Sequence, residues 1–349
     1  MSEGRVRIVD IAEELGLSTA TVSNVIHGKT EKISDETVKR VQELVEKRNY
    51  IPNMAGILLA QNDSRIMGII INDHPKYEGH TLEDGFVTSA INALSAELNQ
   101  SGYFMMVKTT TRWDEIIKIA SMWNMDGLIL IGFCEQDYQN LREKMHIPFV
   151  VYDGFFQGES RLVNLSVDHY GGGFQVGEYL GRLGHKKVLC LSDNMVCMDL
   201  ERMQGCEAAL ERFGGKADRL EIPMESEKRR EFYEQHFEQM RGYTAVFAVS
   251  DFYAADFVRF MQKKGCKIPE ELSVVGFDDN IYSTTCLPTL TTVRQDPAVR
   301  AKKAREALLA LRRGEKIEGN IVLPVEMVIR ESVSKLEDGR DRNGRDKKE

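Results

Sequence analysis

Short apolar runs alternate with amphipathic segments along most of this chain, from residue 64 to residue 335. The runs cover residues 66–71, 103–108, 127–131, 148–152, 187–191, 245–249 and 273–277. Runs of this length that are apolar throughout are typical of parallel strands buried on both faces. Their alternation with helical segments, such as 86–100 and 174–183, predicts parallel sheets covered by helices. Because the runs fall into two successive series, we expect an α/β core of two lobes with a cleft between them.

The first fifty residues follow a different pattern and predict an all-α head. Apolar residues recur at helical spacing from Ile8 to Leu15, and Gly16 can adopt the positive φ that ends a helix. Ser18 and Ser34 are suitable N-caps for two further helices. The apolar positions of those helices are Val22, Val25 and Ile26, then Val38, Val41, Leu44 and Val45. Two short helices joined by a glycine-containing turn form the helix-turn-helix pattern.

The second of these helices is expected to enter the major groove of double-stranded DNA. The candidate DNA contacts in the head are Ser18, Thr19, Ala20, Thr21, Ser23, Asn24 and Lys29. Asn24 can form paired hydrogen bonds to adenine, and Ala20 can contact a thymine methyl group. The hydroxyls of Thr21 and Ser23, together with Lys29, can hold phosphates. A three-helix module for protein contacts is the alternative. The net charge of −8 does not exclude DNA, because only the field at the contact face matters.

The head carries a recognisable set of motifs. Its runs 9–12, 16–18, 21–23 and 49–53 closely resemble the head of the lactose-repressor (LacI/GalR) family. Matching stretches continue to about Ser332, at 168–172, 183–188, 202–205, 268–269, 272–279, 288–293, 323–326 and 330–332. The resemblance implies a homodimer, a near-palindromic operator and a core shaped like the periplasmic sugar-binding proteins. It also implies that a small effector, expected to be a saccharide, controls operator affinity from the cleft, and hence a cytoplasmic transcriptional repressor.

Residues 51–63 are expected to form a hinge between the head and the core. Pro52 cannot continue the last helix of the head, and Asn53 can cap a new helix that begins after it. The resemblance implies a hinge helix whose Leu59 wedges into the minor groove, which adds Asn53 and Leu59 to the candidate DNA contacts. The alternative is an ordinary linker whose Leu58 and Leu59 pack on the core.

The hinge departs from the family at two positions, where Gly56 and Ile57 replace the usual alanine and arginine. Glycine destabilises a helix by about 1 kcal/mol relative to alanine, and the lost arginine removes a contact to DNA. We therefore expect weaker operator binding than in typical relatives. The double variant Gly56→Ala, Ile57→Arg should bind operator DNA more tightly in a titration at fixed salt concentration; an unchanged affinity would contradict this expectation.

Polar residues at strand ends are the candidates for effector binding, because ligands of open α/β sheets bind at the carboxyl ends of the strands. The candidates are Phe86, Asp153, Arg202, Ser250, Asp278 and Tyr282, with Phe155 as a weaker aromatic candidate. An aspartate accepts hydrogen bonds from two neighbouring hydroxyls, and a guanidinium donates to two, which suits a sugar. The resemblance places family effector contacts at Asp153, Arg202, Ser250 and Asp278, where Arg202 is expected to open a helix. A structural role is the alternative for each, and the favoured one for Asp251.

Two segments of the core invite competing interpretations. Residues 73–83 form a longer segment than the family usually has, and they could extend the cleft for a longer saccharide. We favour a solvated loop, and we reject His74 and His80 as a metal pair because no further ligand has suitable spacing. Glycines 171–173, expected just before the helix at 174–183, lack the form of a phosphate-binding loop. Close helix packing explains them better.

These observations define the expected domain organisation. The head covers 1–50, the hinge 51–63 and the effector-binding core 64–335, with an N-lobe at about 64–165 and 293–325 and a C-lobe at about 166–292 and 326–335. The tail, 336–349, is charged, is expected to be disordered and lacks the leucine heptads of a tetramer-forming zipper. No apolar run is long enough for a membrane span.

The sequence also bears on the rival functions. No Ser-His-Asp, zinc or phosphate-loop constellation is visible, so we expect no enzyme, no cofactor and no metal. Two alternatives to the sugar-responsive repressor stay open. One is the same fold responding to a purine or a phosphoprotein corepressor, which a cleft with more aromatic and fewer carboxylate groups would favour. The other, more remote, is a sugar-binding or sugar-modifying enzyme with an incidental head.

Overall fold

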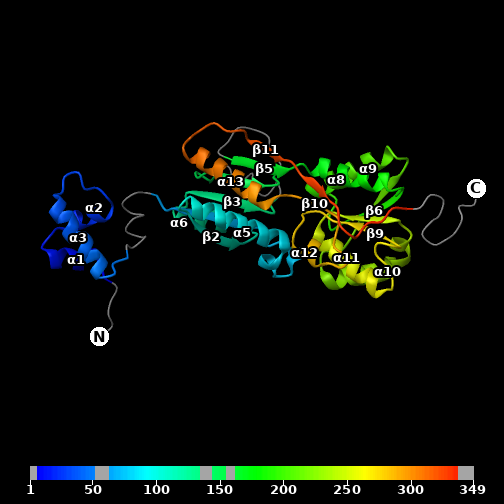
Figure 1. The fold of residues 1–349 in the computed structure, drawn as a ribbon, viewed down its shortest axis with the longest axis horizontal. Coiled ribbons are helices and arrows are strands. Elements are labelled where there is room, and N and C mark those ends of the chain that lie inside the picture. Colours follow the sequence, from blue (N-terminus) through cyan, green and yellow to red (C-terminus); the bar gives the residue numbers. More distant parts are fainter. Residues whose placement is uncertain (1–5, 52–62, 134–143, 155–161, 337–349) are drawn as a thin grey trace, which may run out of the picture. The chain divides into compact units, whose positions relative to one another are not determined.

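The computed structural model describes residues 6–51, 63–133, 144–154 and 162–336 (Figure 1). The chain divides into two compact units, Met1–Ser64 and Arg65–Glu349. The hinge residues Asn53, Gly56, Ile57 and Leu59, the aromatic Phe155 and nearly all of the tail lie outside the described residues. Within the described part, no helix is both long enough and apolar enough to cross a bilayer.

The head consists of three helices, α1 (Ile8–Leu15), α2 (Thr19–Ile26) and α3 (Asp35–Lys47). Gly16 adopts a φ of 68° at the end of α1, and the Ser18 hydroxyl accepts a hydrogen bond from the Thr21 amide at the start of α2. The three helices bury a common apolar core of Ile11, Ala12, Val22, Val25, Val41, Leu44 and Tyr50. The predicted all-α helix-turn-helix head is confirmed.

The N-lobe is built on a six-stranded parallel sheet in the order β11-β5-β4-β3-β1-β2. The strands are β1 (Ile66–Ile71), β2 (Phe104–Thr109), β3 (Gly127–Ile131), β4 (Phe149–Tyr152), β5 (Leu162–Val167) and β11 (Asn320–Leu323). On one face, Ile69 and Ile71 pack with α5 (Gly85–Gln100) and α13 (Pro297–Arg312). On the other, Ile70 packs with α6 (Trp113–Met122). This double burial explains why β1 is apolar throughout.

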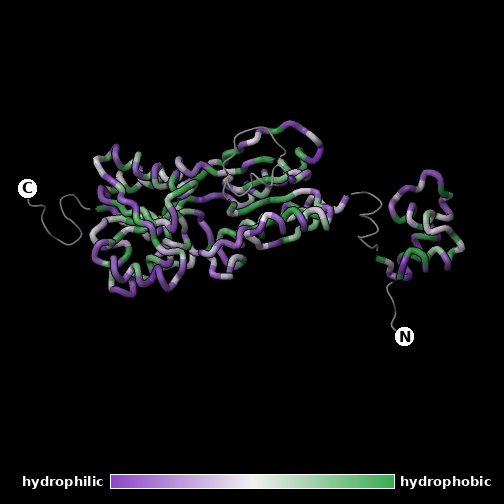
Figure 2. Tube along the Cα trace, turned by 180° about the vertical axis from the view of Figure 1, so that it is seen from behind, coloured by the Kyte–Doolittle hydropathy of each residue, from purple (hydrophilic) through white to green (hydrophobic). Residues whose placement is uncertain are grey.

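The C-lobe repeats the arrangement with a four-stranded parallel sheet in the order β7-β6-β8-β9. Its strands are β6 (Lys187–Ser192), β7 (Lys216–Glu221), β8 (Ala245–Ala248) and β9 (Ser273–Val275). One face is covered by α8 (His169–Arg182) and α9 (Cys197–Glu211), the other by α10 (Ser226–Arg241) and α11 (Asp251–Lys263). Hydrophobic residues run through the centre of the core and polar ones lie mostly outside (Figure 2). The predicted two-lobed α/β core of parallel sheets is confirmed.

The chain passes between the lobes after β5, before α13 and after β11. Near the last two passages, β10 (Thr292–Arg294) pairs antiparallel with β12 (Glu326–Val328). Five strands, β5, β7, β10, β11 and β12, were not predicted from the sequence. The edge strand β7 is mostly polar (Lys-Ala-Asp-Arg-Leu-Glu), and β10 and β12 have only three residues each, so none of these three strands gives a continuous apolar run.

The glycines at 171–173 lie inside α8, which begins at His169 and not at residue 174 as predicted. A Cβ on Gly173 would lie 1.9 Å from the carbonyl oxygen of Arg202 in α9, and one on Gly177 would lie 2.3 Å from that of Cys206. These positions therefore let the backbones of α8 and α9 approach closely, as the packing interpretation holds.

Candidate functional sites

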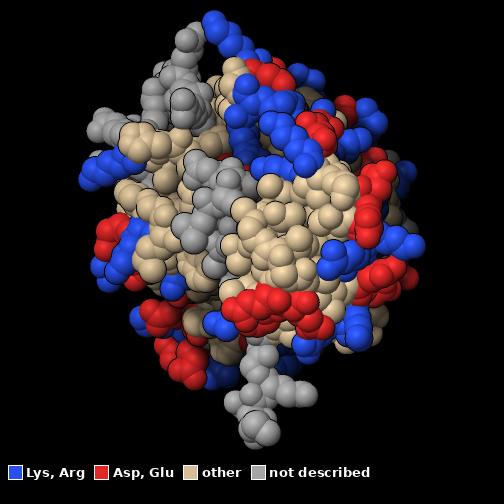
Figure 3. Space-filling model, turned by 90° about the vertical axis from the view of Figure 1, so that its left-hand side faces the viewer, with Lys and Arg blue, Asp and Glu red and all other residues tan. Residues whose placement is uncertain are grey.

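The second helix of the head presents the candidate DNA contacts. Thr19, Ala20, Asn24 and Lys29 are exposed, whereas Thr21 and Ser23 are half-buried. The Ser18 and Thr21 hydroxyls lie 2.9 Å apart and hydrogen-bond each other, so Ser18 acts first as a helix cap. Figure 3 shows one face of the molecule, on which Lys and Arg gather toward one edge, with Asp and Glu among them, beside a largely uncharged area. The exposed side chains of Thr19, Ala20 and Asn24 can read base edges, and Lys29 can hold a phosphate.

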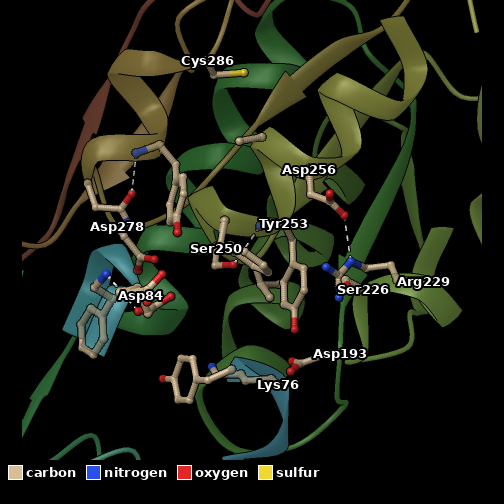
Figure 4. A pocket seen from close by; sticks show the side chains of 18 of the residues that line it. Lys76, Asp84, Asp193, Ser226, Arg229, Ser250, Tyr253, Asp256, Asp278 and Cys286 are labelled. Carbon is tan, nitrogen blue, oxygen red and sulfur yellow. Dashed lines mark hydrogen bonds and ion pairs between the residues drawn. The ribbon is translucent and has the colours of Figure 1, made fainter. Parts of the chain in front are cut away.

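A cavity of about 740 Å³ in the core brings together all six effector candidates, Phe86, Asp153, Arg202, Ser250, Asp278 and Tyr282. The residues come from both lobes and include ends of strands and starts of helices. Figure 4 shows Asp84, Ser250 and Asp278 on one side of this cavity, Ser226, Arg229 and Asp256 on the other, and Tyr253 between them. The expectation that the strand-end residues share one cleft agrees with this placement.

At the inner end of the cavity, buried polar residues form a closed ring of interactions that crosses from one lobe to the other. The ring consists of Arg300, Asp153, His169, Arg202, Asp278 and Gln295. Asp153 and Arg300 belong to N-lobe elements, His169 and Arg202 to C-lobe helices, and Gln295 to a segment that passes between the lobes. A change in the separation of the lobes must therefore disturb this ring.

Asp153 is the N-lobe carboxylate of the ring and follows β4 directly. One oxygen lies 2.7 Å from Nη2 of Arg300 and 3.0 Å from Nε2 of His169. Burial acts to raise the pKa of Asp153, but the charge of Arg300 and the hydrogen bond from His169 outweigh it and hold the pKa well below its usual range. Asp153 also has a φ of 55°, which non-glycine residues seldom adopt and which is often found at functional sites.

Arg202 occupies the second turn of α9, so the expectation that it opens the helix is wrong. Its Nε donates to Nδ1 of His169 at 3.2 Å, its Nη1 donates to the Val249 carbonyl at 2.6 Å, and its guanidinium lies 3.8 Å from the centroid of the Phe277 ring. Because Nδ1 of His169 accepts, the imidazole proton must be on Nε2, which donates to Asp153. Burial lowers the pKa of His169, which keeps the imidazole neutral.

Asp278 is the C-lobe carboxylate of the ring, with a φ of 123°. It accepts a hydrogen bond of 2.6 Å from Nε2 of Gln295 and lies 3.9 Å from Nη1 of Arg202. Burial raises the pKa of Asp278 to about 7, against the opposing effects of Arg202 and Gln295. At neutral pH this carboxyl group is therefore divided between its charged form, which accepts hydrogen bonds, and its neutral form, which can also donate one.

The raised pKa predicts a pH-dependent stability of the core. A folded-state pKa of about 7 against an ordinary 3.8 means that the folded state binds the proton more tightly, so the stabilisation is complete below pH 4 and is lost as the pH rises through 7. Relative to Asp278→Asn, the free energy of unfolding should fall by up to about 1.4 kcal/mol per pH unit between pH 5 and 7. Urea unfolding of both proteins measures this, and parallel pH profiles would refute it.

The remaining candidates line the cavity and also have local structural roles. The Ser250 hydroxyl caps α11 by accepting from the Tyr253 amide. Phe86 lies in the first turn of α5, 5.9 Å from the guanidinium carbon of Arg300. Tyr282, in α12 (Ile281–Thr285), packs edge-on against Phe252. All three side chains nevertheless line the cavity, where they add aromatic surface and a hydroxyl to its wall.

Asp251 has the structural role that we favoured for it. It is fully buried and accepts hydrogen bonds from the Thr292 hydroxyl at 2.6 Å and from the Asn280 amide at 3.0 Å. Burial raises its pKa. It anchors the start of α11 to the segment after β9 and does not line the cavity.

The segment at 73–83 is exposed over much of its length, as a solvated loop should be, and it also lines the cavity. It forms two short 3-10 turns, η1 (Pro75–Tyr77) and η2 (Thr81–Glu83), and it contributes Lys76, Tyr77, Glu78, His80 and Glu83 to the cavity wall. Its mostly polar sequence is compatible with either outcome, so the sequence pattern could not decide between them. The described residues contain no cluster of potential metal ligands. His74 instead accepts from the Lys76 amide, and His80 pairs with Glu83.

Several cavity residues were not anticipated from the sequence, among them Asp84, Asp193, Asp199, Arg229, Phe252, Tyr253 and Asp256. Asp193 directly follows β6, so the rule used for the other strand ends also finds it. Arg229, Tyr253 and Asp256 lie within helices α10 and α11, where no local pattern separates a cleft residue from a packed one.

Comparison with known proteins gives consistent matches over nearly the whole chain. Residues 7–53 match the lacI family of bacterial regulatory proteins, and residues 178–333 match the periplasmic binding protein-like domain. The HTH-type transcriptional repressor CytR of Escherichia coli (strain K12) is 26% identical over 94% of this chain and 96% of that protein. The HTH-type transcriptional repressor PurR of Vibrio atlanticus (strain LGP32) is 29% identical over 86% and 90%. The lac repressor dimer bound to operator and the anti-inducer ONPF superimposes with a TM-score of 0.82 at 23% identity, over 95% of this chain and all of that one.

Proposed function

Because the chain belongs to the lacI family of bacterial regulatory proteins, we propose that it is a homodimeric repressor whose affinity for a near-palindromic operator is controlled by a saccharide in the cleft. As a member of the family it is a DNA-binding transcriptional regulator with a ligand-binding core. The relatives that it matches are transcriptional regulators, and we propose that this chain likewise has no catalytic role and acts in the cytoplasm, where the chromosome is.

The interlobe ring is the observation that carries the proposed effector control. It joins carboxylates and guanidinium groups of both lobes in a closed series of hydrogen bonds and ion pairs. Four members of this series line the cavity: Asp153, Arg202, Asp278 and Gln295. A polyhydroxylated ligand can bind both kinds of group and so favour one separation of the lobes. A ligand shifts such an equilibrium only by the difference between its affinities for the two states, which the ring, made by residues of both lobes, would provide.

The charges around the cavity favour a neutral ligand over an anionic one. The carboxylates that line it are Glu78, Glu83, Asp84, Asp153, Asp193, Asp199, Asp256 and Asp278, and the Lys and Arg residues are Lys76, Arg202, Arg229 and Arg259. The excess of negative charge opposes a phosphorylated sugar or a phosphoprotein segment. We therefore infer a neutral saccharide.

A purine is the second candidate effector, and it is favoured by the aromatic side chains in the cavity. Those side chains are Tyr77, Phe86, Phe252, Tyr253 and Tyr282. Against it stands the larger set of carboxylates, most of which a purine could not satisfy with hydrogen-bond donors.

Thermal unfolding of the purified protein with monosaccharides, oligosaccharides, sugar phosphates, purines and nucleosides tests the effector class. A ligand at about 100 times its Kd should add about 2.7 kcal/mol and raise the midpoint by several degrees. Stabilisation by neutral sugars alone is the expected result. A response to purines or nucleosides but not to sugars would transfer the assignment to the second candidate.

The operator-binding role predicts a large loss of affinity for Asn24→Ala. A paired hydrogen bond from an asparagine to adenine contributes about 1–3 kcal/mol of discrimination, so binding to the preferred duplex should weaken about 5- to 150-fold. The duplex is first obtained by selection from a random library, which should return a near-palindromic site. Gln42→Ala, an exposed amide on α3, is the matched control and should bind normally. Equal affinities for the two variants would remove Asn24 from the interface.

A further inference from the structure

We propose that the outer half of the cleft is a second sugar subsite, built by the 73–83 segment with α10 and α11, so that the effector is an oligosaccharide of at least two rings. This inference rests on the proposed saccharide effector and adds its size class. The outer subsite is defined here by Tyr77, Ser226, Arg229, Phe252, Tyr253 and Asp256, all of which line the cavity.

The size of the cavity exceeds what one sugar ring requires. A hexose has twelve non-hydrogen atoms, and even if each took the roughly 30 Å³ that a water molecule occupies in the liquid, they would fill about half of the 740 Å³. In Figure 4, Asp278 of the inner ring lies at one end of this space, and Arg229 and Asp256 lie at the opposite end. A monosaccharide bound at the inner ring therefore leaves the outer half to water.

The walls of the outer subsite are aromatic. Tyr77 is contributed by the N-lobe, and Phe252 and Tyr253, which pack edge-on with ring centroids 5.1 Å apart, by the C-lobe. Aromatic faces suit the C–H groups of a sugar ring, because the negative face of the ring attracts their weakly positive hydrogens. An outer subsite with aromatic side chains on both lobes can thus hold a second ring between them.

The polar groups of the outer subsite are held in place before any ligand binds. Arg229 is 2% exposed, its Nε donates to Asp256 at 2.8 Å, and its Nη1 donates to the carbonyls of Pro223 and Met224. Tyr253 is 3% exposed, and burial together with the charge of Asp193 raises the pKa of its phenol. Figure 4 shows its hydroxyl pointing toward the space near Lys76 and Asp193. A sugar hydroxyl in this space can accept a hydrogen bond from the phenol and donate one to the carboxylate.

The charges of the outer subsite are matched within the protein, which selects an uncharged occupant. Asp256 accepts 2.8 Å hydrogen bonds from both Arg229 and Arg259. Glu78 accepts from the amide and the hydroxyl of Ser226, at 3.0 and 3.3 Å. An anionic or cationic group placed here would have to displace one of these partners, whereas a neutral ring with hydroxyls need not.

The contact between Glu78 and Ser226 also connects the lobes at this end. Glu78 belongs to the 73–83 segment of the N-lobe, and Ser226 begins α10 of the C-lobe. The arrangement of the lobes in this structure therefore has contacts at two places, the inner ring and this pair, and a ligand long enough to reach both would gain from both. This gives a two-ring ligand its advantage over a one-ring ligand.

Matched pairs of sugars test the second subsite: glucose with cellobiose and with maltose, galactose with lactose, and xylose with xylobiose. The affinity of each is measured by calorimetry on the full-length protein after a thermal-shift screen. At least one disaccharide should bind ten or more times more tightly than its monosaccharide. Tyr77→Ala should weaken that disaccharide at least fivefold more than the monosaccharide. Tyr170→Ala, an exposed tyrosine on α8 outside the cavity, is the matched control and should leave both affinities unchanged.

The possible outcomes distinguish failure of the second subsite from failure of the proposed saccharide effector. A monosaccharide that binds as tightly as every disaccharide containing it would overturn the second subsite while the proposed saccharide effector stands. If no sugar of the panel binds, both the second subsite and the proposed saccharide effector are rejected. If Tyr77→Ala does not fold, the second subsite is still tested by the ratio of disaccharide to monosaccharide affinity in the unaltered protein, because that measurement needs no variant.

Discussion

Arg202→Ala is expected to abolish the stabilisation of the core by its saccharide effector. The guanidinium joins His169, Asp278 and the Val249 carbonyl at the inner end of the cavity, and it is 4% exposed. Its loss removes the donors that a sugar hydroxyl would use and leaves Asp278 without its nearest cation. We expect no ligand-dependent rise in the unfolding midpoint, where the unaltered protein should gain about 2.7 kcal/mol at 100 times Kd.

The same variant should be destabilised without ligand. Removing one partner of a buried ion pair typically lowers the free energy of unfolding by about 3–5 kcal/mol, because the other charge is left uncompensated. Here the higher pKa of Asp278 softens the loss, since the carboxyl group can take up a proton. Arg212→Ala, an exposed residue at the end of the same helix, is the matched control.

Ligand response and stability are read separately in this experiment. If Arg202→Ala is too unstable to purify, Arg202→Lys keeps a cation near Asp278 but cannot reproduce the forked donation, and it should lose the response with less destabilisation. A ligand-induced shift of the usual size in a folded Arg202 variant would remove the inner ring from the effector site.

The parts of this protein that could be predicted from sequence are those governed by local rules. Gly16 and Ser18 bound the turn of the head through a positive φ and a capping hydroxyl, both set by the residues themselves. The run 66–71 is apolar throughout because its strand is covered on both faces. Asp153 and Asp278 were found because parallel strands end at one edge of a sheet.

The parts that could not be predicted depend on contacts distant in sequence. Asp153 and Arg300 are 147 positions apart, and their pairing results from the passage of the chain between lobes rather than from any local pattern. Glu78 and Ser226 are also distant in sequence, and no local pattern predicts the hydrogen bonds between them that join the 73–83 segment to α10. Effector candidates could therefore be found from the sequence, but not the ring of interactions that holds three of them together.

Gly173→Ala is expected to destabilise the core severely, although the substitution favours an isolated helix by about 1 kcal/mol. A Cβ at this position would lie 1.9 Å from the carbonyl oxygen and 2.9 Å from the Cα of Arg202. The backbone atoms of Arg202 cannot change rotamer as a flexible side chain can. The helices α8 and α9 must therefore separate, and the packing between them is lost. We expect a loss of at least about 3 kcal/mol in the free energy of unfolding, measured in urea.

A control variant on the same helix separates the effect of this clash from that of an ordinary substitution. Glu178→Ala lies on the same helix with its side chain partly exposed, and it should change stability by less than about 1 kcal/mol. Because the clash falls on the backbone of Arg202, any Gly173→Ala protein that does fold should also lose the saccharide response. A variant as stable as Glu178→Ala would show that the two helices can separate freely. The position of Arg202, and with it the geometry of the inner ring, would then not depend on the close approach of α8 and α9.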